Sequence, residues 1–276
     1  MIKTGKAALS TPGCPLLTIF VKVLLLFLLA SVLVFISCAG HKDLQLRFHG
    51  RFLYDRLERS ELPWEVWAKS VEGKNIYLYE IGEGKPVTVI FGGFHGSEPL
   101  SSELAFQFAE YLYNEFHNKI NSKVVIVPAV NPDGLVRSQW TNANGVDLNR
   151  NFPTQNWTSE FEKENQNPGE YPASEPETRA IIELIEKYQP DRIISIHTPL
   201  RKVNYDGPAK DLALLMSKFN HYPISADIGY PTPGSFGTYT GDEGNIPTVT
   251  LELPKVSFQK IWDQNLEALL AVIQYY

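Results

Sequence analysis

Two histidines and a glutamate stand where strands are predicted to end, and these residue types bind Zn²⁺. The tetrapeptide His95-Gly96-Ser97-Glu98 follows the apolar run Val87–Phe91 and a Gly92-Gly93 bend, and His197 ends a later apolar run. Two imidazoles and a carboxylate can hold Zn²⁺ and leave a fourth position for water. The pattern therefore favours one zinc ion and a hydrolase over a surface histidine beside a helix-capping glutamate.

A second carboxylate, Glu252, lies within the apolar run Thr248–Leu253. Burying a carboxylate is costly unless it is paired or functional. Near an activated water it can act as a general base and then as a general acid toward the leaving amine. We therefore expect Glu252 to be catalytic, and the alternative is an exposed glutamate on an edge strand.

The segment Gly145–Phe152 combines an arginine with amides and a carboxylate. Arg150 can clamp a substrate carboxylate in bidentate geometry, with the amide of Asn149 beside it. Asp147 can accept a hydrogen bond from a liganding histidine and so fix the tautomer of that ring. The alternative interpretation is a turn with a buried leucine and a solvated arginine.

The elements that must position these residues alternate along the chain. Strands are predicted at 87–91, 124–127, 193–196 and 248–253, and helices at 102–116, 176–188, 211–219 and 259–275, with Ser101 or Ser102 capping the first helix. Fully apolar strands alternating with helices predict an α/β fold, with a mixed, mostly parallel central sheet and helices on both faces. Sites in such sheets gather at the carboxyl ends of the strands. The irregular stretch 128–173 is predicted to be a functional loop.

The N-terminal segment has the pattern of an export signal. Lys3, Lys6 and Lys22 precede the apolar run 23–36, and Cys38 follows in a sequence like a bacterial lipobox. We expect residues 1–37 to be a lipoprotein-type signal, 38–65 a tether and first packing segment, and 66–276 the catalytic domain. An uncleaved membrane anchor over 19–36 is the alternative. Both place the protein in the bacterial cell envelope, exported and tethered to a membrane through a lipid at Cys38 or through the anchor.

Charge and cysteine content exclude several other classes. The 276 residues carry a formal net charge of −6, and loss of the signal, which holds three lysines and no acid, makes it more negative. Such a surface argues against nucleic acid as a partner. Because Cys14 lies in the predicted signal, only Cys38 would remain, which leaves neither a disulfide framework nor a thiolate zinc site.

Taken together, the motifs resemble the carboxypeptidase-A-like zinc metallopeptidases. The resemblance rests on residues 93–98, 131–134, 145–152, 195–197 and 251–253, which stand in the family's order. It implies that His95, Glu98 and His197 hold zinc. It also implies that Asn149 and Arg150 grip the terminal carboxylate of a peptide, and that Glu252 is the general base.

Three longer runs, 142–153, 174–178 and 229–237, are similar to the murein peptide amidase branch of that family. This similarity implies a murein peptide substrate, cut between γ-D-glutamate and meso-diaminopimelate. Tyr230 falls where the wider family often has a mobile tyrosine that caps the substrate. The alternative for Tyr230 is an aromatic residue in a Pro/Gly-rich turn.

One departure from the branch concerns the oxyanion. Trp140 stands where the branch usually has an arginine, and Arg137 is the candidate replacement. Loss of one such donor typically costs 10²–10³ in rate. Two alternatives therefore stay open. One is a general metallocarboxypeptidase on L-peptides, since Gly237 falls where the specificity pocket of the wider family is set and offers no charge. The other is a catalytically weakened peptidoglycan-binding lipoprotein on the same fold.

Overall fold

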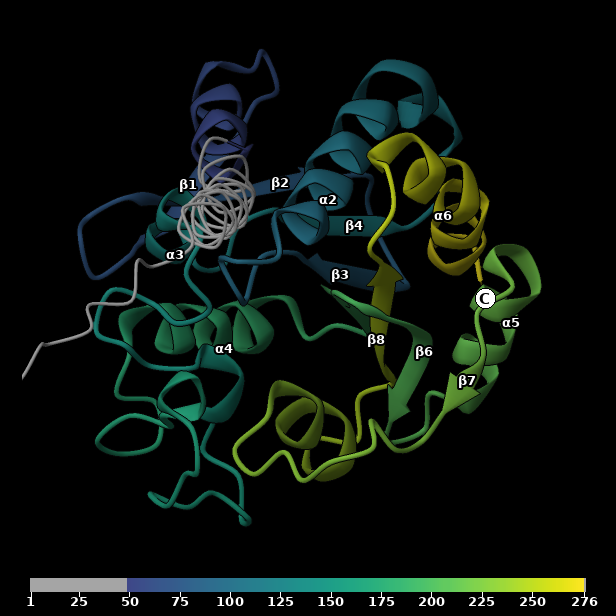
Figure 1. Ribbon diagram of the computed structural model, residues 1–276. Helices are drawn as coiled ribbons and strands as arrows, with labels where there is room; N and C mark the ends of the chain where they lie inside the picture. The colour runs from purple at the N-terminus through teal and green to yellow at the C-terminus, as the bar shows by residue number, and fades with distance from the viewer. Residues whose placement is uncertain (1–48, 276) are drawn as a thin grey trace, which may run out of the picture. The chain divides into compact units, whose positions relative to one another are not determined.

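The computed structural model describes residues 49–275, and these are built around an eight-stranded sheet (Figure 1). The predicted export signal and Cys38 lie outside the described residues. The strands lie in the order β1-β2-β4-β3-β5-β8-β6-β7. Their bounds are β1 Glu65–Lys69, β2 Asn75–Ile81, β3 Val87–Phe91, β4 Lys123–Val127, β5 Arg192–His197, β6 Leu200–Asp206, β7 Ile224–Ser225 and β8 Thr248–Pro254.

The four central strands, β4, β3, β5 and β8, run parallel to one another, and antiparallel strands flank them on both sides. Every residue of β3 and β5 is buried. Strands covered on both faces are apolar at successive positions, which is the pattern that the sequence shows. The predicted mixed, mostly parallel sheet is therefore confirmed.

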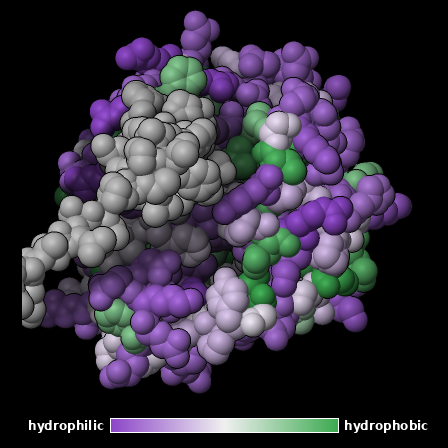
Figure 2. Space-filling view, viewed as in Figure 1, coloured by the Kyte–Doolittle hydropathy of each residue, from purple (hydrophilic) through white to green (hydrophobic). Residues whose placement is uncertain are grey.

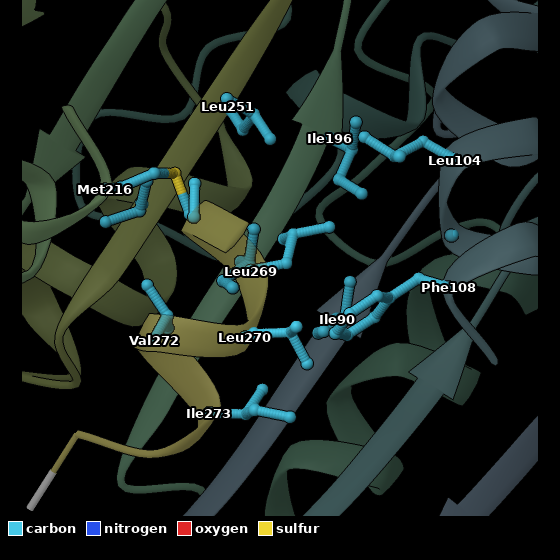
Figure 3. Close-up of a cluster of buried hydrophobic side chains, with 14 of the residues drawn as sticks. Ile90, Leu104, Phe108, Ile196, Met216, Leu251, Leu269, Leu270, Val272 and Ile273 are labelled. Atoms are coloured by element: carbon cyan, nitrogen blue, oxygen red, sulfur yellow. The ribbon is translucent and has the colours of Figure 1, made fainter. Parts of the chain in front are cut away.

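Helices cover both faces of this sheet. The described α-helices are α2 Pro99–Tyr111, α3 Pro132–Arg137, α4 Pro176–Tyr188, α5 Lys210–Asn220 and α6 Phe258–Ile273. Short π- or 3₁₀-helical turns lie at Leu112–Phe116, His117–Lys119, Leu148–Arg150, Glu164–Gln166 and Thr238–Glu243. On one face α2, α5 and α6 bury a continuous cluster that includes Ile90, Ile196 and Leu251 (Figure 3). The other face packs against α4 and the segments around Leu148 and Phe236.

The start of α2 differs from the sequence prediction. The helix begins at Pro99, directly after Glu98, because proline is well suited to the first helical position. Ser101 does not cap it. Its hydroxyl donates to the carbonyl of Glu98 at 2.6 Å and accepts from the N–H of Gly93 at 3.1 Å. Ser101 therefore ties the first turn of the helix to the end of β3.

Strands β1, β2, β6 and β7 were not predicted from the sequence. β6 is partly exposed and carries charged residues, and it pairs with β8 at six positions. Residues 49–59 are helical and pack Leu53, Tyr54 and Leu57 against Phe106 of α2. Within residues 49–275, no helix is long and apolar enough to cross a membrane. The face seen in Figure 2 is largely hydrophilic, with small apolar spots between the polar side chains.

Candidate active site

The sheet brings the candidate metal ligands to one edge. His95 and Glu98 lie on the loop that leaves β3, and His197 is the last residue of β5, the neighbouring strand. Suitable donor atoms of these three residues all lie within 4.8 Å of one another, and all three side chains are buried. The structure therefore brings His197 to a glutamate and a histidine that precede it by 99 and 102 positions in the chain.

The spacing of the donor atoms fits a tetrahedral ion. Glu98 Oε2 lies 3.3 Å from His95 Nδ1 and 3.2 Å from His197 Nδ1, and the two Nδ1 atoms are 3.2 Å apart. Ligands 2.0–2.1 Å from a tetrahedral Zn²⁺ are about 3.3 Å from one another. The three residues thus occupy three corners of such a site and leave the fourth open.

Each imidazole is held through its other nitrogen. His95 Nε2 lies 3.1 Å from Asp147 Oδ1, and His197 Nε2 lies 3.1 Å from Ser195 Oγ. A metal-binding histidine commonly donates its distant N–H to such a partner, which fixes the tautomer and leaves the near nitrogen free to coordinate. The predicted contact between Asp147 and a liganding histidine is present.

The charges of the cluster are strongly coupled. Burial opposes ionisation of Glu98, but the neighbouring His95 and His197 outweigh it and lower the pKa of the carboxyl to about 2. Burial likewise opposes protonation of His95, but Glu98 and Asp147 outweigh it and raise the pKa of the imidazole to about 9. A buried anion surrounded by imidazoles is the electrostatic environment that a divalent cation prefers.

The ligand loop is shaped by close backbone contacts. Gly93 has φ = 68°, and a side chain on Gly96 would overlap the backbone of Gly134 in α3. Asn131 caps α3 by accepting from Gly134 N–H at 2.8 Å, and its amide donates to the carbonyl of Phe94 at 3.2 Å. The motif 131–134 thus supports the loop rather than lining the cavity.

A cavity of about 190 Å³ opens in front of the three ligands and is also lined by Asn149, Arg150 and Glu252. Arg150 is 6% exposed, and its guanidinium donates to the carbonyl of Asn149 at 2.6 Å. The side-chain oxygen of Asn149 accepts from the N–H of Phe236 at 2.9 Å. This bond orients the side-chain amide of Asn149 beside the guanidinium.

Glu252 lies opposite His197 in the parallel register of β5 and β8. Its side chain is 5% exposed, and Oε2 accepts from the N–H of Leu200 at 3.3 Å. Burial, aided by the negative charge of Glu98, outweighs the imidazoles and raises the pKa of the Glu252 carboxyl. The residue is on a central strand and not on an edge, so the exposed alternative is excluded.

Tyr230 lines the same cavity from the segment between β7 and the turn at 238–243, and it is 48% exposed. Burial of its hydroxyl, followed by the charge of Glu252, raises the pKa of the phenol. The side chain therefore lies near the predicted catalytic carboxylate while remaining half open to solvent.

Arg137 is not placed at the cavity. It ends α3, its side chain is 41% exposed, and its guanidinium pairs with Glu72. Among the described residues that line the cavity, Arg137 is absent and Trp140 is present. The helix directs Arg137 toward the β1–β2 turn, so the structure does not bring it to the position of an oxyanion donor.

An acidic end of the cavity was missed by the sequence prediction. Asn204 and Asp206 of β6 and Asp242 of the turn at 238–243 line it. Burial, together with Asp242, raises the pKa of Asp206 to about 7. Asn204 is 5% exposed, and its side-chain oxygen has no hydrogen-bond partner among the described residues.

These residues correct the inference drawn from Gly237. A side chain at Gly237 would collide with the carboxylate of Asp206, so the pocket takes its charge from β6 and not from position 237. The sequence did contain a signal. Thr248, Thr250 and Glu252 alternate in β8, and Asp206 and Asn204 are the register partners of the two threonines.

Comparison with known proteins agrees with this geometry. The family model described as zinc carboxypeptidase matches residues 63–209. Murein peptide amidase A of Vibrio campbellii is 35% identical over 227 residues, which cover 76% of this chain and 86% of that relative. The catalytic chain of human carboxypeptidase N is 30% identical, over 69% of this chain and 48% of its own length.

Solved structures give the same result. The murein-tripeptide amidase of Escherichia coli O157 superposes with a TM-score of 0.68 and 30% sequence identity, covering 80% of this chain and 96% of that one. Bovine thrombin-activatable fibrinolysis inhibitor superposes with a TM-score of 0.65 at 21% identity, over 81% of this chain and 91% of that one, which is a likeness of fold.

Proposed function

The chain belongs to the zinc carboxypeptidase family, and from this premise we propose that it hydrolyses an amide bond in murein peptides. The bond is that between γ-D-glutamate and meso-diaminopimelate. The observation that carries the proposal is the position of Glu252, which lies beside His197 and lines the same cavity as His95 and Glu98.

His95, Glu98 and His197 would hold the zinc ion. When bound there, zinc supplies a Lewis acid and an activated water at neutral pH. Asp147 and Ser195 hold the two imidazoles in the required tautomers. The donor set of two nitrogens and one oxygen is the set found in catalytic zinc sites that keep one position open.

Glu252 is the proposed general base and acid. Its raised pKa brings the carboxyl nearer to neutral pH, where a group both accepts and returns a proton efficiently. It takes a proton from the attacking water and delivers a proton to the departing amine of diaminopimelate. The N–H of Leu200 keeps one carboxylate oxygen in place during both transfers.

Substrate orientation follows from charge. Arg150, with Asn149 beside it, would bind the free carboxylate next to the scissile amide. Asn204, Asp206 and Asp242 offer acceptors for an ammonium group at the other end of the cavity. Diaminopimelate carries one carboxylate beside the scissile amide, and its distal α-carbon carries an ammonium group together with a second carboxylate. The first carboxylate matches Arg150, and the ammonium group matches the acidic end. Tyr230 would cover the bound residue.

The test is release of diaminopimelate from L-Ala-γ-D-Glu-meso-diaminopimelate, followed by chromatography. The wild type is expected to release it, and Glu252→Gln to be slower by about 10³-fold. Equal rates would refute the mechanism. Bound zinc without turnover of any murein peptide would instead favour the peptidoglycan-binding alternative.

A second candidate is a carboxypeptidase acting on L-peptides that end in lysine or arginine. Asp206 favours it too, because a basic side chain also carries a cation into that end of the cavity. Parallel assays with the murein tripeptide and with L-Ala-L-Lys separate the two candidates. Faster turnover of the L-dipeptide would assign the protein to the second.

We further propose that the protein is an exported lipoprotein of the bacterial envelope, attached to the membrane through Cys38. The support is the sequence of residues 1–38, with its basic start, apolar run and lipobox-like end. Incorporation of labelled fatty acid in the wild type but not in Cys38→Ser is expected. Membrane association without labelling would favour the uncleaved anchor.

A further inference from the structure

Trp140 touches the metal site without offering it a ligand. Its indole ring lies against the imidazole of His95 with ring centroids 3.7 Å apart and planes 20° apart. Its Nε1–H donates to Asp147 Oδ2 at 3.1 Å. We propose that Trp140 is a positioning residue that holds His95 in the orientation required for metal binding.

The first part of the argument is the hydrogen-bond chain. Asp147 is fully buried, and its Oδ1 contacts His95 Nε2 while also accepting from the N–H of Asn149 at 2.9 Å. The indole N–H satisfies the other oxygen. A buried carboxylate with both oxygens engaged cannot rotate without breaking a bond, so the indole fixes the group that fixes His95.

The second part is stacking. Contact with the indole restricts rotation of the His95 ring about its bond to Cβ, and the flat face shields that ring from solvent. His197 has a more distant aromatic neighbour, since its ring lies nearly parallel to that of Phe94 with centroids 5.7 Å apart. Each imidazole of the metal site therefore has an aromatic ring beside it.

The backbone of Trp140 is attached to the same loop. Its carbonyl accepts from Gly96 N–H at 3.4 Å, one residue beyond His95. The side chain also forms a wall shared by the metal cavity and a neighbouring cavity of about 480 Å³. Because its N–H is engaged by Asp147, the indole acts on the ligand and does not point that donor at a substrate oxyanion.

The experiment measures metal retention and needs no substrate, so its result is independent of the proposed murein activity. The zinc-loaded protein is mixed with excess 4-(2-pyridylazo)resorcinol, and the rate of zinc transfer is followed by absorbance. Loss of a group that orients a ligand typically costs 10–100-fold in metal affinity. Trp140→Ala is expected to release zinc about 100-fold faster, and Trp140→Phe, which keeps the stack but loses the N–H, about 10-fold faster.

Trp64→Phe is the matched control. Trp64 also stacks on an aromatic ring, Phe106, and donates its N–H to Ser60, but it lies outside the metal cavity. Its zinc release should equal that of the wild type. Release from Trp140→Ala at the wild-type rate would overturn the proposal.

Two further measurements separate positioning from general destabilisation. The visible spectrum of the Co²⁺-loaded protein should change in Trp140→Ala and be restored in Trp140→Phe, whereas a purely structural loss would leave the spectrum of the folded fraction unchanged. Combining Trp140→Phe with Asp147→Asn should cost less than the sum of the single changes, because both break one hydrogen bond. Additive losses would show that the N–H does not act through Asp147, and would refute that part of the proposal.

Discussion

The two ends of the active-site cavity shift the pKa values of their carboxyl groups in opposite directions. At the metal end, imidazoles lower the pKa of Glu98 to about 2. At the acidic end, burial and then the charge of Asp242 raise the pKa of Asp206 to about 7, because the neighbour is a second carboxylate and not a cation. Burial alone therefore does not decide the state of a carboxylate, whereas the sign of its neighbours does.

The difference suggests what each end binds. The metal end has anions and imidazoles converging on one point, which suits a resident ion. Among the described residues that line the acidic end, there are hydrogen-bond acceptors but no cationic side chain. This suits an ammonium group that arrives with the substrate. The following predictions test this division, beginning with the largest effect.

Removal of the metal should stop the hydrolysis of every substrate. Dialysis against 1,10-phenanthroline is expected to abolish hydrolysis of the murein tripeptide, and one equivalent of Zn²⁺ should restore it. Activity and zinc content are measured on the same samples. Full activity of the zinc-free protein would remove the distinction between the two ends.

Asp206→Asn should affect only substrates with a distal ammonium. We expect kcat/KM for the tripeptide ending in meso-diaminopimelate to fall about 100-fold, because an ammonium would lose its charged partner in a buried site. The tripeptide ending in 2-aminopimelate, which lacks that ammonium, should be hardly affected. Asp211→Asn, on α5 and outside the cavity lining, is the control. Equal losses with both substrates would contradict an ammonium site.

The preference for the ammonium should depend on pH. Since Asp206 ionises near pH 7, the ratio of kcat/KM for these two tripeptides should rise about tenfold between pH 6 and pH 8. Taking the ratio cancels titrations that both substrates share, including that of Glu252. A ratio that stays constant over this range would show that Asp206 does not ionise between pH 6 and pH 8.

The same shift has a consequence for stability with a defined sign. The folded protein binds the proton of Asp206 more tightly than the unfolded chain, whose value is near 3.8. The contribution of this group to the free energy of unfolding is therefore present at low pH and is lost as the pH rises from about 4 to about 7. Urea unfolding across that range should show the free energy of unfolding of the wild type falling relative to that of Asp206→Asn, because the comparison cancels the titrations that both proteins share.

Asp242→Asn should give the smallest effect. Removing the neighbouring charge lowers the pKa of Asp206, so the midpoint of the substrate-ratio titration should move to lower pH. For each protein, the ratio of kcat/KM for the two tripeptides at pH 6 is divided by the same ratio at high pH. This quotient should be a few-fold larger in the variant than in the wild type. A midpoint that does not move would show that burial alone sets the pKa.

The metal end could be predicted from the sequence because its residues follow apolar strands whose ends meet at one edge of a parallel sheet. His95, Glu98, His197 and Glu252 are of this kind. The acidic end could not be predicted in this way. Asp206 is placed by β6, a partly exposed antiparallel strand with no apolar run, and its position depends on pairing with β8.

Arg137 illustrates the same limit. It was the candidate oxyanion donor because it lies three residues before Trp140, but α3 turns its side chain toward Glu72. A short helix changes the direction of a side chain by about 100° per residue, so small shifts in where it starts decide which surface a residue faces. Sequence spacing on a loop does not contain that information.

The register between β5 and β8 places His197 directly beside Glu252. Two neighbouring strands of a sheet are about 4.8 Å apart, and their hydrogen bonds hold that separation. The segments around 155–168 and 226–234, in contrast, lie outside the sheet, and their residues line the metal cavity or the neighbouring cavity. Exchanging those loops for the corresponding loops of relatives should change which peptide is accepted, while His197 and Glu252 stay in place. The protein is therefore a scaffold on which the choice of cleaved amide can be changed.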